Sequence, residues 1–249
     1  MRAWYSQLRP FRLDLVGDYA GSSRFLIYGD SLLRHCFSDE RIGFSDGSFQ
    51  LLHTVYVVEQ FLQGLVRRKC VFDIVFLDSD AEMCIPPTGS RGAAKWLCTR
   101  EIVIRHLLGV KGGEWQIRQF TGISERTFLG WIEERRPLFV LAGDGSGLVG
   151  AAWESVTSEN DDSDDSEDEE DEVGASEDDD DDDDDGDEES EDNGHASMAI
   201  KHRMIVMISS FMGMGYNIAL ISRVQFVNSK VLDPLRKLMP YLTLTLKDL

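Results

Sequence analysis

Cysteine is scarce in this sequence, and the four that occur form no metal-binding pattern. Cys36, Cys70, Cys84 and Cys98 include no CxxC pair and have no histidine pair at zinc spacing, which argues against a structural zinc site. Most of them lie in or beside apolar runs. We therefore expect buried thiols in a reducing compartment, and we place the protein in the cytoplasm with the nucleus as the alternative.

Two further motifs are missing. No G-x-x-x-x-G-K-[ST] sequence occurs, so this stretch by itself is not expected to hydrolyse ATP, and no charged-then-apolar signal peptide is found. One long uncharged run, residues 204–221, contains Ser209, Gly213, Gly215 and Asn217. These residues favour a helix that ends and turns into a strand, so we expect no membrane segment.

Lysine and arginine are absent from residues 159–192, which hold 25 of the 45 acidic residues. The rest of the chain therefore has 20 acidic against 25 basic side chains, and the net charge of −20 hides a mildly basic body. A basic body is compatible with nucleic-acid binding. The segment 157–195 has almost no apolar side chains and its charges repel one another, so we predict that it is disordered.

The acidic run has two interpretations. In the first, it is an interacting segment, either a nucleic-acid mimic that competes for the basic body or a contact for a basic protein partner. In the second, it is a solubilising insertion. Because it stands between a predicted strand and a predicted helix, it interrupts one domain instead of linking two, and a fold tolerates such an insertion at little entropic cost.

Apolar periodicity predicts an α/β fold. We expect strands over 25–28, 71–77, 115–120, 138–142 and 216–222, a loop after residue 28, and helices over 48–68, 92–108, 124–135, 197–212 and 228–239. Alternating strands and helices predict a single, mainly parallel sheet with flanking helices. The expected organisation is a leader over 1–22, one domain over 23–156 and 196–240, and a truncated tail over 241–249.

Two of the predicted strands end on carboxylates. Asp30 follows the strand at 25–28, and Asp78 and Asp80 follow the strand at 71–77. Strand ends in a parallel sheet face the crevice where ligands bind, so these acids are candidates for a Mg²⁺ or Mn²⁺ site that cleaves phosphodiesters. Glu59, near the apolar side of a helix, is a further candidate ligand. The alternatives are turn chemistry for the aspartates and a solvent-reaching position for Glu59.

Two other signals are less specific. Residues 145–150 (GSGLVG) match G-x-G-x-x-G but run into the acidic segment, so we interpret them as a glycine loop and expect no nucleotide cofactor. A basic cluster is a candidate for phosphate contacts, with a solvated helix end as the alternative; it comprises Arg67, Arg68, Lys69, Arg91, Lys95 and Arg100.

The order of these motifs resembles a PIN-like nuclease domain, and more specifically the N-terminal region of the long antiviral-type DExD/H-box RNA helicases of the Ski-like superfamily 2 group. The resemblance rests on residues 18–21 (DYAG), 25–33 (FLIYGDSLL), 57–59 (VVE), 72–78 (FDIVFLD) and 218–226 (IALISRVQF). It implies a Rossmann-like three-layer fold, a first site acid at Asp30 and a helix acid at Glu59. It also implies a helicase core elsewhere in a longer protein.

The late strand departs from the PIN-like pattern. In these nucleases it ends in Ser or Thr followed closely by an acid, whereas here Arg223 follows Ser222 and Gln225 is neutral. An arginine near two carboxylates would pair with them and displace a metal ion. Asp144 could substitute as a ligand only if the fourth strand ends beside the first.

These observations lead to three hypotheses. The first is a catalytically degenerate PIN-like module that binds RNA or organises contacts within a larger RNA helicase, with no cofactor. The second is an active Mg²⁺- or Mn²⁺-dependent ribonuclease that uses Asp30, Asp78 and Asp80. The third is a protein-interaction domain that acts through the acidic run 159–192.

Overall fold

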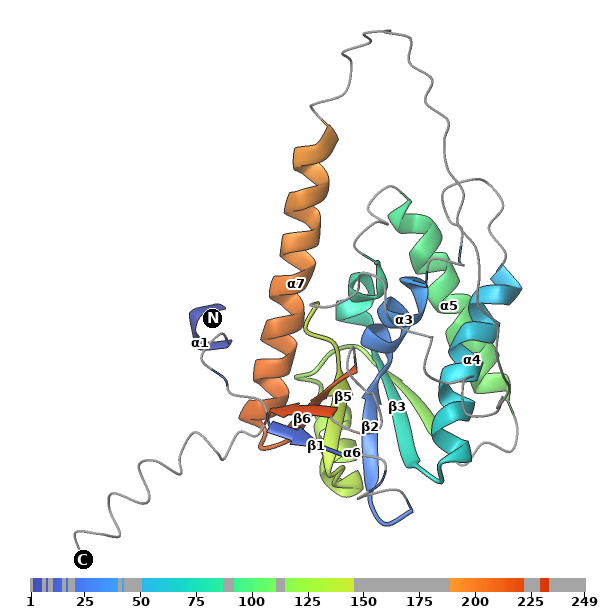
Figure 1. Ribbon diagram of the computed structural model, residues 1–249, viewed down its shortest axis with the longest axis vertical. Coiled ribbons are helices and arrows are strands. Elements are labelled where there is room, and N and C mark those ends of the chain that lie inside the picture. Colours follow the sequence, from blue (N-terminus) through green and yellow to red (C-terminus); the bar gives the residue numbers. More distant parts are fainter. Residues whose placement is uncertain are drawn as a thin grey trace, which may run out of the picture.

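The computed structural model describes residues 2–5, 8, 11–14, 17, 21–39, 42, 51–86, 92–110, 115–145, 189–221 and 229–232. In this part of the chain, seven strands form one sheet (Figure 1). The strand order is β1-β7-β6-β5-β2-β3-β4. The strands are β1 (Phe11–Leu13), β2 (Arg24–Tyr28), β3 (Val71–Leu77), β4 (Gln116–Phe120), β5 (Phe139–Ala142), β6 (Asn217–Leu220) and β7 (Ser229–Leu232). All pairs from β6 to β4 are parallel, whereas β7 is antiparallel to both β6 and β1.

Helices cover both faces of this sheet. One core contains buried residues of α3 (Gly29–Phe37), α4 (Leu51–Arg67) and α5 (Ala93–Gly109), and the other contains those of α6 (Arg126–Arg135) and α7 (Glu189–Gly213). Alternate residues of β2 enter the two cores, with Phe25 and Ile27 in the first and Leu26 and Tyr28 in the second. Burial on both faces explains the unbroken apolar run of this strand. The predicted α/β fold with a mainly parallel sheet is confirmed.

Residues 29–37 and 229–232 differ from the predicted secondary structure. Residues 29–37, expected in a loop, form α3. Residues 229–232 form strand β7, where a helix was predicted over 228–239. Val231 and Leu232 enter opposite cores, so pairing with β6 and burial on both faces override the local helical pattern. Residues 228 and 233–239 of that predicted helix lie outside the described part of the chain.

Part of the segment 1–22, which we expected to be a leader, belongs to the folded domain. Strand β1 pairs with β7, with Phe11 opposite Val231. The short helix α1 (Arg2–Tyr5) contacts α7, and Trp4, Tyr5 and Leu8 pack against the core beneath α7. Elements of three and four residues are too short to produce a periodic sequence signal, which explains why this prediction failed.

The acidic run connects β5 to α7. Helix α7 begins at Glu189, so the last residues of the segment 157–195, predicted to be disordered, are helical. Residues 146–188 lie outside the described residues, and disorder there stays a prediction. Among the helices that the structure describes, none is both long and apolar enough to cross a membrane.

Candidate functional site

Three neighbouring parallel strands each lead into an aspartate at the same side of the sheet, which we call the C-terminal edge. Asp30 lies in the first turn of α3, directly after β2. Asp78 opens the 3₁₀ helix η1 (Asp78–Cys84) after β3, and Asp144 follows β5. Strand β2 pairs with both β3 and β5, so the three strand ends are adjacent.

Gly29 makes the turn from β2 into α3 possible. A Cβ atom at this position would lie 2.3 Å from the Phe76 ring, so a larger residue would displace that ring. The turn places Asp30 in the first turn of α3, where the helix dipole favours a negative charge. The same turn buries the Asp30 side chain completely.

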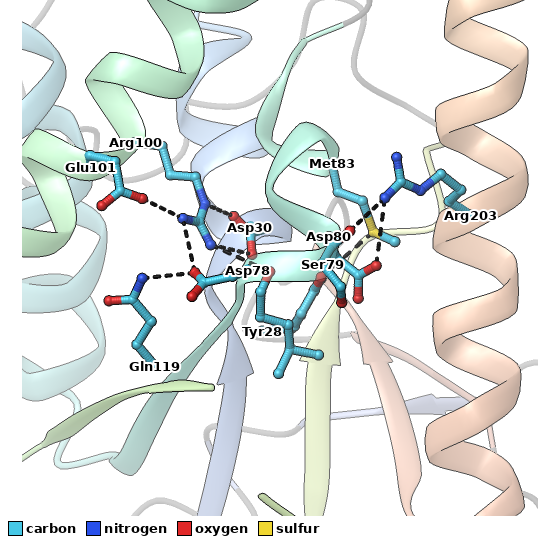
Figure 2. A network of polar contacts seen from close by, with 11 residues as sticks. Tyr28, Asp30, Asp78, Ser79, Asp80, Met83, Arg100, Glu101, Gln119 and Arg203 are labelled. Atoms are coloured by element: carbon cyan, nitrogen blue, oxygen red, sulfur yellow. Dashed lines mark hydrogen bonds and ion pairs between the residues drawn. The ribbon is translucent and has the colours of Figure 1, made fainter. Parts of the chain in front are cut away.

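Asp30 forms a buried ion pair with Arg100 of α5 (Figure 2). Arg100 Nε donates to Asp30 Oδ1 at 2.6 Å, and Nη2 donates to Oδ2 at 3.3 Å. The side chains are 0% exposed for Asp30 and 2% exposed for Arg100. The guanidinium therefore engages both oxygens of the carboxylate in the fork geometry typical of strong arginine–carboxylate pairs.

The rest of the Arg100 guanidinium is also engaged. Nη2 donates to the Leu77 carbonyl oxygen at 3.4 Å, Nη1 donates to Glu101 Oε1 at 2.7 Å, and Nη1 lies 3.6 Å from Asp78 Oδ1. Gln119 of β4 donates to the same Asp78 oxygen at 2.7 Å. Arg100 thus joins the carboxylates that follow β2 and β3.

The electrostatics of this pair follow from its burial. Burial raises the pKa of the Asp30 carboxyl to about 7, and the hydrogen bond and charge of Arg100 oppose that rise. Burial on its own lowers the pKa of Arg100, but the hydrogen bond and charge of Asp30 outweigh it and raise that pKa above its usual value. Arg100 therefore keeps its positive charge beside the carboxylates.

A second arginine holds the other side of η1. Arg203 of α7 donates from Nη1 to Glu82 Oε2 at 2.5 Å and from Nη2 to the Ser79 carbonyl oxygen at 2.7 Å, and Nη2 lies 3.7 Å from Asp80 Oδ1 (Figure 2). Burial raises the pKa of Asp80, whereas Arg203 and hydrogen bonds with Tyr28 and Ser79 act to lower it. Helices from opposite faces of the sheet therefore hold η1 between two cations.

Asp144 is nearly buried and accepts a hydrogen bond from the Tyr5 hydroxyl at 2.7 Å. Burial raises the pKa of Tyr5 and the Asp144 charge raises it further, so the hydroxyl keeps its proton and remains the donor. The fourth predicted strand does end beside the first, as a substitute role for Asp144 requires. Its carboxylate is nevertheless in contact with the N-terminal segment.

Other residues predicted for the site lie elsewhere or are not described. Glu59 Oε1 lies 2.8 Å from His106 Nε2, in a pair between α4 and α5 that is exposed to solvent. Arg223 lies outside the described residues, so its predicted ion pair stays a prediction, as does the interpretation of residues 146–150. An arginine does contact both Asp30 and Asp78, but it is Arg100.

The roles of Arg100 and Arg203 were not predicted from the sequence. Arg100 was grouped with residues that contact phosphates, yet it is buried. A signal existed, because Arg100 shares the helical spacing of the buried side of α5, which includes Trp96, Val103, Ile104 and Leu107. A cation on a buried face needs an acidic partner. Arg203 is partly exposed, so its position in the sequence does not indicate that it needs an acidic partner.

These contacts do not fit a Mg²⁺ or Mn²⁺ ion. Both oxygens of Asp30 already accept hydrogen bonds from the Arg100 guanidinium, whose positive charge would repel a metal ion bound to the same carboxylate. Across the described ranges, no group of three or more His, Cys, Asp or Glu side chains is placed to hold a metal ion. The arrangement supports fixed charge pairing at the place where a cation would otherwise bind.

Comparison with known proteins identifies a family that covers most of the folded part of the chain. The model of the family described as "ATP-dependent RNA helicase DDX60, PIN-like domain" matches residues 9–149. This range exceeds half of the chain and includes Asp30, Asp78, Asp80 and Arg100, whereas α7 with Arg203 lies beyond it. No solved structure matches the chain.

Proposed function

Because the chain belongs to the family of the PIN-like domain of the ATP-dependent RNA helicase DDX60, we propose that it is a PIN-like module that binds RNA without cleaving it. In this proposal the module serves a longer RNA helicase, and the ATPase motifs lie outside these residues. A module that only organises contacts within such a helicase is the alternative, and it would have no affinity for RNA.

The ion pair between Arg100 and Asp30 is the main support for the proposal that the module does not cleave RNA. A metal ion at Asp30 would have to displace a guanidinium that is buried and bonded to that carboxylate and lies close to Asp78. Breaking a buried ion pair by removing one partner costs about 3–5 kcal/mol, because the other charge is left without compensation. A metal ion would have to offset that cost before it contributed to a reaction.

The RNA-binding part of the proposal is supported by charge. Outside residues 159–192, basic side chains outnumber acidic ones by 25 to 20. A positive body attracts the phosphate backbone, and that attraction supplies most of the affinity in sequence-independent binding.

A cleavage assay tests the loss of catalysis. Labelled single-stranded RNA is incubated with Mn²⁺ and the wild-type chain, the Asp30→Asn variant, or the Glu59→Gln variant as a control acid away from the site. We expect intact RNA in all three reactions. Cleavage by the wild type and by Glu59→Gln that disappears in Asp30→Asn would establish the ribonuclease and overturn the proposal.

A further inference from the structure

We infer that RNA contacts the edge of the sheet where the parallel strands begin, opposite the C-terminal edge that holds Asp30, Asp78 and Asp144. This inference rests on the proposed RNA binding. Six basic residues lie where β2, β3 and β5 begin or in the segments that lead into these strands. They are Arg24, Arg67, Arg68, Lys69, Arg135 and Arg136, and we call them the basic N-terminal edge. The corresponding ends of α4, α6 and the strands lie together on the lower side of Figure 1.

Backbone contacts make this edge continuous. Arg24 pairs in the sheet with Val71, and Val71 follows Lys69 by two residues. The position of a Cβ on Gly21 is 3.8 Å from the Lys69 carbonyl oxygen, so the turn before β2 touches the turn before β3. The Leu138 N–H donates to the Arg24 carbonyl oxygen at 2.9 Å, which joins the segment after Arg136 to the same edge.

The cations of this edge are accessible. Arg67, Lys69 and Arg136 are exposed, and Arg24 and Arg135 are partly exposed while they hold the buried Asp73. The exposed acids on the last turn of α6 are Glu133 and Glu134. Six basic residues against these two acids and the paired Asp73 leave an excess of positive charge.

The C-terminal edge has the opposite character. Arg100 and Arg203 are bound to carboxylates there, and Asp78, Glu82 and Glu101 remain about half exposed. Strand β5, which precedes the segment with 25 acidic residues in the chain, also ends on this side. A phosphate backbone would be repelled from this side and attracted to the other.

The basic N-terminal edge fits a single strand of RNA better than an acidic peptide. Five of its six residues are arginines, which bind phosphate through a planar fork of donors. Trp115, directly before β4 at the same edge, is partly exposed and stacks on Phe72 with ring centres 5.5 Å apart. An aromatic side chain beside a line of cations is the arrangement that binds bases and backbone together.

The test compares two variants with the same change in net charge. Lys69→Glu with Arg136→Glu reverses two cations of the basic N-terminal edge. Arg126→Glu with Lys201→Glu reverses two exposed cations at the start of α6 and beside Gly145 at the end of β5. Binding of a fluorescein-labelled twelve-nucleotide oligouridylate to the full chain is measured by anisotropy at several salt concentrations, and circular dichroism checks that both variants are folded.

Loss of two phosphate contacts is expected to reduce the slope of log affinity against log salt by about 1.4, which is about 25-fold in affinity at 0.1 M salt. We expect this loss for the first variant and less than about a 3-fold loss for the second. Equal losses in both variants, or no loss in the first, would overturn the location while leaving RNA binding intact. A wild-type chain that binds an aspartate-rich peptide but not RNA would overturn both this inference and the RNA-binding half of the proposed function.

Discussion

Asp30 and Asp73 are both buried aspartates held by arginine, and they lie towards opposite edges of the same sheet. Asp30 pairs with Arg100, and neither side chain is more than 2% exposed. Asp73 accepts hydrogen bonds from Arg24 Nη1 at 2.9 Å to each oxygen and from the Gln116 N–H at 3.1 Å, and Arg135 Nε lies 3.6 Å away. The side chains of Arg24 and Arg135 are 33% and 24% exposed.

The difference lies in where the cation sits. At Asp73, several donors share one carboxylate and two of their cations still reach water, so the loss of one donor leaves others in place. At Asp30, both charges have left water, which carries a large desolvation penalty and makes each charge depend on the other. The position of the cation, more than the number of contacts, therefore determines how sensitive each network is to mutation.

Removal of Arg100 should have the largest effect. At pH 8, above the pKa of Asp30, Arg100→Ala leaves a buried carboxylate without its counter-ion, so we expect the free energy of unfolding to fall by about 3–5 kcal/mol. Urea unfolding followed by circular dichroism measures the change. A loss below 1 kcal/mol would mean that Asp30 does not depend on this partner, and the contrast with Asp73 would disappear.

Removal of Arg24 should have an intermediate effect. In Arg24→Ala, Asp73 retains the Gln116 N–H and Arg135, so we expect a loss of about 1–2 kcal/mol in the same urea experiment. The double variant with Arg135→Ala then tests the sharing of donors. If Arg24→Ala alone is as damaging as Arg100→Ala, exposure of the cation does not moderate the loss.

The pH dependence of stability should distinguish Asp30. Its carboxyl has a pKa of about 7 in the folded protein, above the ordinary value of 3.8 expected in the unfolded chain. Between these values the folded state binds the extra proton. The contribution of Asp30 to the free energy of unfolding is therefore fully present below pH 3.8 and falls as the pH rises through 7, by up to about 1.4 kcal/mol per pH unit.

Asp30→Asn should remove that dependence. Urea unfolding of the wild type and of Asp30→Asn at pH 5, 6 and 7 isolates the contribution, because the Asp80 carboxyl is present in both proteins. Parallel pH profiles for the two proteins would show that Asp30 titrates at its ordinary value despite its burial.

The smallest effect is expected for Arg203. Its side chain is 36% exposed and its main partner, Glu82, is largely exposed, so Arg203→Ala should lower the free energy of unfolding by less than about 1 kcal/mol. Urea unfolding at low and at high salt checks this, since salt screens an exposed pair. A loss comparable to that of Arg100→Ala would show that anchoring of η1 by α7 is a major part of the fold.

The sequence predicted the strands and the site aspartates better than it predicted what surrounds them. Strand β3 is buried on both faces, so its apolar run and the carboxylate that ends it are visible in the sequence. Helix α3 was missed because it starts directly from β2, and Tyr28 at its N-cap makes no side-chain capping bond. The sequence therefore lacks an N-cap signal for this helix.

The partners of the aspartates depend on tertiary contacts. The position of Arg100 on the buried side of α5 is visible in the sequence, but its pairing with Asp30 follows from the packing of α5 against η1 and α4. Arg203 reaches η1 only because α7 crosses the other face of the sheet, on the far side of the acidic segment in the chain. Nothing in the spacing of residues 78–82 and 203 indicates that contact.

The pairing of β1 with β7 has a consequence for synthesis on the ribosome. Phe11 pairs with Val231, so the first and the last of the described strands meet each other. Such a distant contact forms slowly, since a long loop must close before it stabilises anything. Until β7 emerges, β6 lacks a partner on one side and β1 has none in the sheet, and a nascent chain held at that point would present unpaired strand edges to other chains.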